Sequence, residues 1–138
     1  MSVIRDIISE GQLISVPFQQ IDTAASQSNV ALGLTDSSIV DGVMPFDGEI
    51  VAVTVRATAA RTGGTLDVEP TIDGSVIGMV AQLDATNTQS KSTTQPRETD
   101  RFSAGSRIGC NVTTDGSWAP VTADIRATVF VILYLDGI

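Results

Sequence analysis

The amino-acid sequence predicts an all-β protein that folds as a single antiparallel β-sandwich. Apolar and polar residues alternate with a period of two in several segments after residue 29, as they do in strands with one buried face. Dipeptides typical of turns separate these segments, among them Asp47-Gly48, Gly63-Gly64 and Asp115-Gly116. The length of 138 residues corresponds to one domain. Short strands with turns at this spacing are typical of a sandwich or a barrel.

The first 25 residues differ from the rest and are predicted to form an N-terminal arm, with the β-sandwich domain spanning residues 26–138. Apolar residues at positions 3, 4, 7 and 8 would line one side of a short helix, which Gly11 would end. Residues 12–18 are strand-like but contain Pro17, which suits an edge strand or an extended arm. Two interpretations follow: a terminal strand with a frayed end, or an arm that becomes ordered only against a neighbouring molecule.

Two central segments carry the clearest strand pattern. Residues 51–57 alternate between two sets of side chains, one of them made of valine and alanine alone. In the second segment Leu66, Val68 and Ile72 alternate with polar residues, which predicts one buried and one solvated face. Asp73-Gly74 then supplies the positive φ angles of a tight hairpin turn, and residues 75–83 form the return strand.

A polar segment follows at residues 84–99 and offers few side chains for burial. Long loops without structure in a compact domain are usually functional or disordered. The segment is therefore interpreted as a crossing connection that includes a short edge strand, as a contact loop, or as a flexible loop.

The last strand is apolar on both faces toward its end. One face consists of Ile125, Ala127, Val129, Val131, Leu133 and Leu135. The opposite face begins polar and becomes apolar at Phe130, Ile132 and Tyr134. Because a two-layer sandwich buries only one face of each strand, something else must cover these three side chains. Either the N-terminal segment folds back over them or a second subunit does.

Several classes of reactive site are excluded by composition. Histidine is absent, and with it the Ser–His–Asp triad and the commonest zinc ligand. The single cysteine, Cys110, shares its face with Ile108 and Val112 and is expected to be a buried apolar residue. Asp and Glu are numerous, but Asp36 and its neighbours at 41 and 47 lack the spacing of a calcium loop. We therefore expect no catalytic residue, no metal and no cofactor, and the protein is not expected to be an enzyme.

The lone tryptophan, Trp118, stands on a turn before the last strand. It is interpreted as a lid over one end of the sandwich. The alternative is a platform for stacking a carbohydrate, but only 4% of the residues are aromatic, which argues against a glycan-binding face.

Charge restricts the possible partners. The formal net charge is −8, and the eight basic residues are spread along the chain without a cluster. Binding to nucleic acid or to an anionic membrane is therefore not expected. The first residues contain an acidic side chain and no signal-peptide core, which favours synthesis in a cytoplasm.

The order of segments from residue 30 to residue 136 resembles that of a known family. The resemblance rests on the turn and strand of residues 44–57, on residues 64–68 with Ile72-Asp73-Gly74, on residues 101–108, and on the long hydrophobic last strand. This pattern is similar to that of the small jelly-roll proteins that tailed bacteriophages place on their capsids, called decoration or cement proteins. Similar modules occur as phage head fibres and tail knobs.

The resemblance implies a jelly-roll-like fold and a structural role in a virion. Such a protein binds the outer surface of a phage capsid and stabilises the shell by bridging capsid subunits. The implied partners are the major capsid protein and, because decoration proteins are often trimers, two further copies of the chain. The candidate subunit interface consists of Phe130, Ile132 and Tyr134, and the candidate capsid-contact arm of Ile4, Ile8 and Leu13.

The implied location is the capsid surface of a virion, after synthesis in the cytoplasm of the host. Two other interpretations remain. One is a receptor-binding, head-fibre or tail-knob module of a phage, for which loops rich in aromatic residues would be expected. The other is a cellular β-sandwich that serves as a binding or accessory domain.

Overall fold

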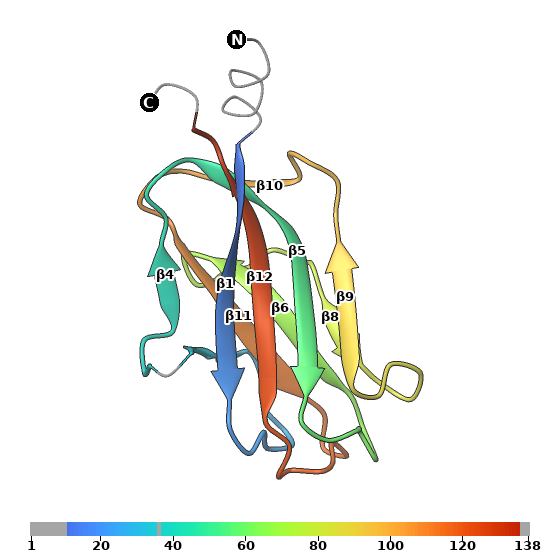
Figure 1. Cartoon of the computed structure of the whole chain (residues 1–138). Coiled ribbons are helices and arrows are strands. Elements are labelled where there is room, and N and C mark those ends of the chain that lie inside the picture. The colour runs from blue at the N-terminus through green and yellow to red at the C-terminus, as the bar shows by residue number, and fades with distance from the viewer. Residues whose placement is uncertain (1–10, 36, 136–138) are drawn as a thin grey trace.

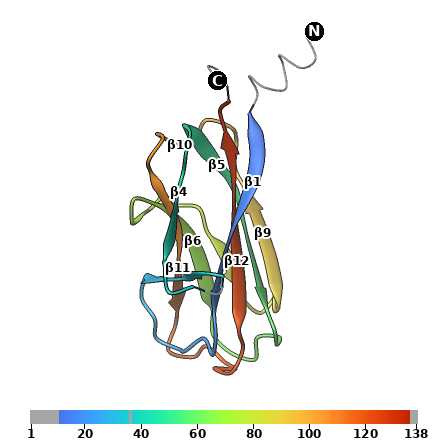
Figure 2. The ribbon, with the colours of Figure 1, turned by 60° about the vertical axis from the view of Figure 1, so that its left-hand side comes forward.

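The computed structural model shows two antiparallel β-sheets that face each other, and it describes residues 11–35 and 37–135 (Figure 1; Figure 2). The described residues form these strands: β1 (Gln12–Gln20), β2 (Val30–Ala31), β3 (Gly33–Leu34), β4 (Asp41–Val43), β5 (Gly48–Ala57), β6 (Leu66–Ile72), β7 (Ser75–Val76), β8 (Ala81–Leu83), β9 (Ser90–Thr94), β10 (Asp100–Phe102), β11 (Arg107–Thr114) and β12 (Ile125–Leu133). The described part of the chain contains no helix long and apolar enough to cross a membrane. The predicted all-β sandwich is confirmed.

The strand pairs are nested along the chain. The first strand, β1, pairs with the last, β12, while β2 and β4 pair with β11. Within these pairs, β5 joins β9 and β10, and β6 joins β7 and β8. Nested antiparallel pairs of this kind, folded over into two facing sheets, are the arrangement of a jelly roll. The predicted jelly-roll-like fold is confirmed.

Each sheet places one long strand at its centre. In sheet A, β12 lies between β1 and β5, with β3 beyond β1 and with β9 and β10 beyond β5. In sheet B, β11 lies between β6 and the short strands β2 and β4. The last two long strands in the sequence therefore complete the middle of each sheet.

The core lies between the two sheets and is made by one face of each long strand. From β12, the side chains at positions 125, 127, 129, 131 and 133 are all buried there. Phe18 of β1 and Ile50 of β5 are fully buried beside them, and Leu66 and Val68 of β6 close the core from sheet B. Full burial of one such aliphatic or aromatic side chain stabilises the fold by roughly 1.5–3 kcal/mol. The alternating pattern of the sequence thus predicts most of the inner faces correctly. It is wrong at Val51, because a β-bulge skips this residue in the pairing with β12 and turns Ile50 inward in its place.

The predicted hairpin after β6 is confirmed. Asp73 and Gly74 have φ angles of 51° and 87°, as a tight turn between antiparallel strands requires. The return strand is shorter than predicted, because it breaks into β7 and β8 around Gly78, whose φ is 88°. In the polar segment 84–99, β9 pairs with β5, so the interpretation as a connection with a short edge strand is confirmed.

The N-terminal segment belongs to sheet A from Gln12 onward. Every residue of β1 pairs with β12, and Phe18 of β1 is fully buried. A separate arm that ends at residue 25 therefore does not describe residues 12–20, because their backbone hydrogen bonds and their alternate side chains are part of the sandwich. Ile4 and Ile8, and with them the expected short helix, lie outside the described residues.

Two single residues have the positions that the sequence predicts. Trp118 is 2% exposed, and its indole Nε1 donates a hydrogen bond to the carbonyl oxygen of Thr23 at 3.1 Å. It closes one end of the sandwich and offers no platform for a sugar. Cys110 is buried on the inner face of β11 between Ile108 and Val112, and burial raises the pKa of its thiol to about 12.

Candidate functional site

The candidate functional surface is the outer face of sheet A, to which β1, β12, β5 and β9 contribute. The strand register arranges its side chains in rows. At one end, Leu13 of β1 lies opposite Ile132 of β12, which lies opposite Glu49 of β5. At the other end, Arg126 of β12 lies opposite Arg56 of β5. We call these the apolar end and the basic end of the face.

The apolar end brings together residues that the sequence assigned to two different surfaces. Phe130, Ile132 and Tyr134 share it and are each partly buried, whereas Leu13 is 56% exposed. Leu13 was predicted to contact a capsid and Ile132 to contact a second subunit, yet the two are direct cross-strand neighbours. The predicted capsid contact at Leu13 and the predicted subunit interface therefore share one apolar surface.

The described part of the N-terminal segment does not cover this surface. From Gln12 onward it lies beside β12, as the next strand of the same sheet, and so extends the face instead of shielding it (Figure 2). Among the described residues, β10 and the loop before it lie over part of this surface. Arg101 of β10 lies over the ring of Tyr134, with 5.9 Å between the guanidinium carbon and the ring centre.

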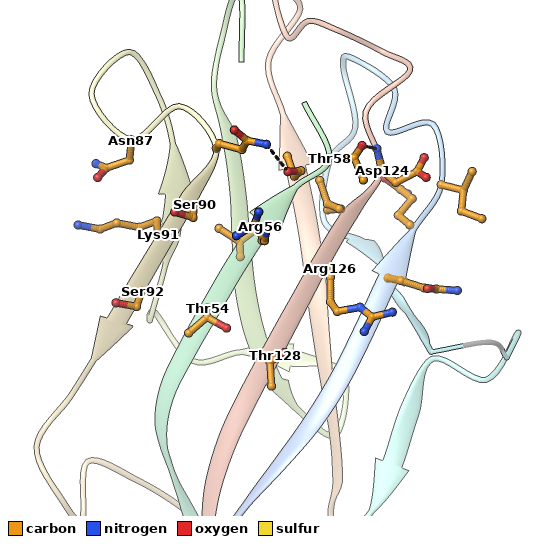
Figure 3. A pocket seen from close by; sticks show the side chains of 17 residues that line it. Thr54, Arg56, Thr58, Asn87, Ser90, Lys91, Ser92, Asp124, Arg126 and Thr128 are labelled. Atoms are coloured by element: carbon orange, nitrogen blue, oxygen red, sulfur yellow. Dashed lines mark hydrogen bonds between the residues drawn. The ribbon is translucent and has the colours of Figure 1, made fainter. Parts of the chain in front are cut away.

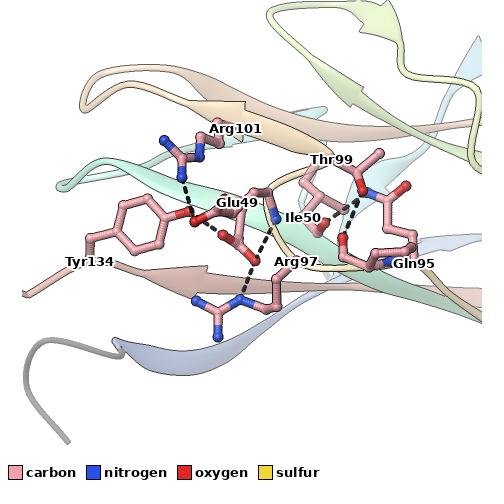
Figure 4. Close-up of polar contacts among 9 residues, drawn as sticks. Glu49, Ile50, Gln95, Arg97, Thr99, Arg101 and Tyr134 are labelled. Atoms are coloured by element: carbon pink, nitrogen blue, oxygen red, sulfur yellow. Dashed lines mark hydrogen bonds and ion pairs between the residues drawn. The ribbon is translucent and has the colours of Figure 1, made fainter. Parts of the chain in front are cut away.

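Beneath this loop lies a buried carboxylate that sequence reasoning did not single out. Glu49 is 0% exposed and accepts hydrogen bonds from Nε of Arg97 and from the hydroxyl of Tyr134 (Figure 4). The backbone N–H of Glu98 donates a third hydrogen bond at 3.3 Å. Arg97 is itself half exposed, so the cluster joins a fully buried acid to the molecular surface. A buried charge is tolerated only with such partners.

Burial and hydrogen bonding act in opposite directions on Glu49. Burial alone raises the pKa of its carboxyl, but the hydrogen bonds from Tyr134, Arg97 and the Glu98 backbone outweigh burial and lower the pKa below its ordinary value. The pKa of Tyr134 is raised by burial and by its hydrogen bond to the Glu49 carboxylate. At neutral pH the carboxylate is therefore ionised and the phenol is protonated.

Further hydrogen bonds hold the loop between β9 and β10, which carries Arg97, against β5. The side-chain amide of Gln95 donates hydrogen bonds to the carbonyl oxygen of Ile50 at 2.8 Å and to the carboxylate of Asp100 at 2.9 Å (Figure 4). Glu98 and Arg101 form an exposed ion pair at 2.7 Å. These bonds hold the loop over Glu49, which positions Arg97 and Arg101 at the apolar end.

The basic end forms an open groove with a volume of about 1080 Å³ (Figure 3). Most of the residues that line it have polar or charged side chains, and they come from β1, β5, β9, β12 and the adjoining loops. Arg56 and Arg126 stand near its middle, and hydroxyl-bearing residues such as Thr54, Thr128 and Ser92 flank them. The lining contains no aromatic residue.

A second apolar surface lies on the edge that β4 forms, and the sequence analysis did not predict it. Ile39, Val40 and Val43 are 60%, 42% and 66% exposed, and Phe46 is 36% exposed. The run of apolar residues from Val43 to Phe46 was a visible signal, but without strand alternation it did not show which side chains face solvent. Among the described residues, β4 pairs only with β11, so its other edge is open.

No protein-family model matches the chain, and no curated protein sequence matches it either. Among the described residues, no group of three or more Asp, Glu, Cys or His side chains could hold a metal ion.

The comparison with solved structures, in contrast, finds one chain with the same fold and others that are less similar. One similar chain belongs to the acidic stable capsid structure of the Helicobacter pylori bacteriophage KHP30, with a TM-score of 0.54 and 10% identity over 90% of each chain. A chain of the cyanophage Pam1 capsid asymmetric unit has a TM-score of 0.48 and 17% identity, over 90% of this chain and 86% of that one. A chain of the honeybee sacbrood virus has a TM-score of 0.43 and 8% identity, over 91% of this chain and 70% of that one. The described sandwich therefore shares its jelly-roll fold with the chain of the KHP30 capsid structure.

Proposed function

We propose that this chain is a structural virion protein of a phage, and that it binds the outer surface of the capsid and stabilises the shell by bridging capsid subunits. The observation that carries the proposal is the jelly-roll fold shared with a chain of a phage capsid over 90% of both chains. The absence of histidine and the buried, protonated Cys110 support a role without catalysis.

The proposed partners are the major capsid protein and two further copies of this chain. The apolar end supports the homotrimer, since Phe130, Ile132 and Tyr134 share an outer face that no described segment of the chain covers completely. Apolar patches of this kind mark interaction sites. We propose Ile4, Ile8 and Leu13 as contacts to the capsid. This proposal is supported by the place of Leu13 at the end of the sandwich where β1 begins and β12 ends (Figure 1).

The proposed mechanism is thermodynamic linkage. A protein that binds only the assembled, expanded shell stabilises that shell by mass action, because disassembly must first release the bound copies. When a trimer contacts several capsid subunits, each further contact becomes intramolecular, so modest affinities per contact combine into tight binding.

Co-sedimentation tests the proposed function. Heads of the virus that encodes this chain, prepared without it, should bind the purified protein and should then withstand a higher temperature before they release their contents. Whole host cells serve as the parallel sample. Binding to cells and not to heads would overturn the capsid proposal and support the alternative role as a receptor-binding or fibre module.

The proposed subunit interface has a separate test in the mass of the protein in solution. Light scattering after size exclusion should give the mass of a trimer for the wild type and that of a monomer for Ile132→Asp. Leu13→Asp is a second variant at a more exposed position, and Val121→Asp is the matched control, because Val121 is 51% exposed outside the apolar end. A trimer that persists in both Ile132→Asp and Leu13→Asp would overturn the interface.

A further inference from the structure

The basic end of sheet A places two like charges side by side. Arg56 of β5 and Arg126 of β12 are direct cross-strand partners, and both are exposed. Like charges at such positions destabilise a sheet. Within residues 11–35 and 37–135, no ion pair joins either guanidinium group to a carboxylate. The pair therefore lacks the counter-charge that would relieve its repulsion.

The strand register extends this pair into a row of polar side chains that crosses four strands. Gln19 of β1 lies opposite Arg126, and Ser90 of β9 lies opposite Arg56. The next row on the same face consists of three hydroxyl-bearing residues, Thr128, Thr54 and Ser92 (Figure 3). Neighbouring strands are about 4.8 Å apart, so the first row spans about 14 Å. An extended ligand can therefore lie across the strands with its charged groups at the arginines.

The acid that also lines this groove is already engaged. Asp124 accepts a hydrogen bond from the backbone N–H of Asp22 at 2.9 Å. Among the described residues, three basic side chains and this one acid line the groove. The groove is thus a basic site in a chain whose net charge is −8.

The composition of the groove favours an acidic polypeptide over other polyanions. Guanidinium groups bind carboxylates through paired hydrogen bonds. Side-chain amides and hydroxyls both donate and accept hydrogen bonds, as the peptide groups of an extended segment require. A nucleic acid needs many neutralised phosphates, which two arginines in a chain of net charge −8 do not supply. The lining also has no aromatic ring on which a sugar would stack.

The groove lies well away from the apolar end of the same face. Arg126 and Ile132 are six positions apart on β12, which corresponds to about 20 Å. A contact between copies that is limited to the apolar end therefore leaves the groove open. A protein that bridges capsid subunits must contact more than one of them, and the groove offers a contact separate from the one proposed at Leu13.

We propose that the basic end binds an extended acidic segment of the major capsid protein, whose carboxylates lie against Arg56 and Arg126. This inference rests on the proposed function, and it names the chemistry of a second capsid contact. With one contact at each end of sheet A, a single copy reaches two capsid subunits, and the second contact forms intramolecularly after the first. The repulsion between the two arginines is relieved when the acidic segment binds.

Affinity for heads tests the groove in the full-length protein. Arg126→Glu places opposite charges on the cross-strand pair, so the urea concentration at the midpoint of unfolding should rise. The dissociation constant for heads prepared without this protein should nevertheless rise at least about 10-fold. Lys91→Glu makes the same change in charge at a side chain that projects away from both arginines, and it should raise the dissociation constant at most about threefold (Figure 3).

The outcomes separate this contact from the proposed function. A loss of affinity confined to Arg126→Glu, without a fall in the unfolding midpoint, would support the groove. An equal loss in Lys91→Glu, or a loss that accompanies destabilisation, would overturn it, because net charge or folding would then explain the effect. Wild-type affinity in Arg126→Glu would also overturn it and leave the capsid role intact. A wild type that does not bind heads would overturn the capsid role and this contact together.

Photo-cross-linking identifies what lies in the groove. Benzoylphenylalanine in place of Ser92, in the row beside the arginines, should couple on heads to a peptide of the major capsid protein that contains Asp or Glu. The same group in place of Val121, which is 51% exposed outside the groove, is the control and should not couple to that peptide. Coupling at Ser92 to a peptide without acidic residues, to a second copy of this chain, to nucleic acid or to a glycan would overturn the proposed occupant. The absence of any adduct from head-bound protein would overturn it as well.

Discussion

The inner and outer faces of sheet A differ in composition and in burial, although the same strands form both. On the inner face, β12 presents one uninterrupted row of aliphatic side chains, and all of them are buried. On the outer face, the same strand passes from Arg126 and Thr128 to Phe130 and Ile132, and none of these is fully buried. The inner face is complete within one chain, whereas the outer face has the composition of a surface that a partner covers.

We infer from this difference that the inner face determines the stability of each copy and that the outer face determines what the chain binds. A substitution on the inner face changes the free energy of unfolding of each copy, because it leaves a cavity in the core. A substitution on the outer face leaves the isolated chain nearly unchanged and alters what the chain can bind. The four predictions below test this division, from the largest expected effect to the smallest.

The largest effect is expected within β1 itself. Phe18 is fully buried on the inner face, so Phe18→Ala should lower the free energy of unfolding by about 3–5 kcal/mol. Leu13, on the outer face of the same strand, provides the control, and Leu13→Ala should change the free energy of unfolding of the monomer by no more than about 0.5 kcal/mol. Urea denaturation monitored by circular dichroism measures both. Equal losses in the two variants would contradict the division between the faces.

Glu49 is the exception on the outer face, because it is fully buried there. Glu49→Gln keeps the size of the side chain but removes the charge that Arg97 and Tyr134 bind, and it should lower the free energy of unfolding by about 2 kcal/mol. The control is Glu98→Gln in the exposed ion pair with Arg101, for which the loss should be at most about 1 kcal/mol. A Glu98 variant as unstable as the Glu49 variant would show that burial of the charge is not what matters.

The same carboxylate predicts a dependence of stability on pH. The pKa of Glu49 in the folded chain lies below its ordinary value of 4.5. Its contribution is therefore complete above pH 4.5, and it is lost as the pH falls through the lowered pKa. The difference in unfolding free energy between the wild type and Glu49→Gln should be constant near neutral pH and shrink in acid. A difference that stays constant down to about pH 2 would contradict the assignment.

The smallest effect concerns reactivity and leaves stability unchanged. Because the thiol of Cys110 is buried and has a pKa of about 12, a thiol reagent at pH ~8 should modify the folded protein at least about 100-fold more slowly than the protein in urea. The matched control moves the thiol to the outer face of sheet A with Ser15→Cys in a Cys110→Ala background. As a monomer, that variant should react at the same rate whether it is folded or unfolded, and protection of its thiol there would contradict the division between the faces. In an oligomer, Ser15 lies beside Phe130 of the proposed interface and is expected to be covered.

The regular part of the fold is predictable from the sequence, because alternation and turns are local signals. The rows of β5, β6 and β12 and the turn at Asp73-Gly74 follow from residues at most a few positions apart. The short strands β2, β3 and β4 contain two or three residues each, too few to show a period. Their pairing depends on strands that lie far away in the sequence.

The candidate site was predictable only in part for the same reason. Phe130, Ile132 and Tyr134 stand out because they break the expected polar face of a single strand. Glu49 gave no such signal, since its partners Arg97 and Tyr134 are 48 and 85 residues away. The pairing of Leu13 with Ile132 likewise requires the register of β1 against β12, which no local pattern specifies.

The position of β12 in the middle of sheet A also determines when this sheet can form during synthesis. On the ribosome, β1 and β5 emerge long before residues 125–133, which must insert between them and bond to both. Until then, each of these two strands exposes an unpaired edge, which is a template for pairing with other chains. Contacts between such distant parts of a chain form slowly. The sheet can close only after residues 125–133 have left the ribosome, and chaperones or dilute conditions should improve its yield more than any change to the local strand sequences.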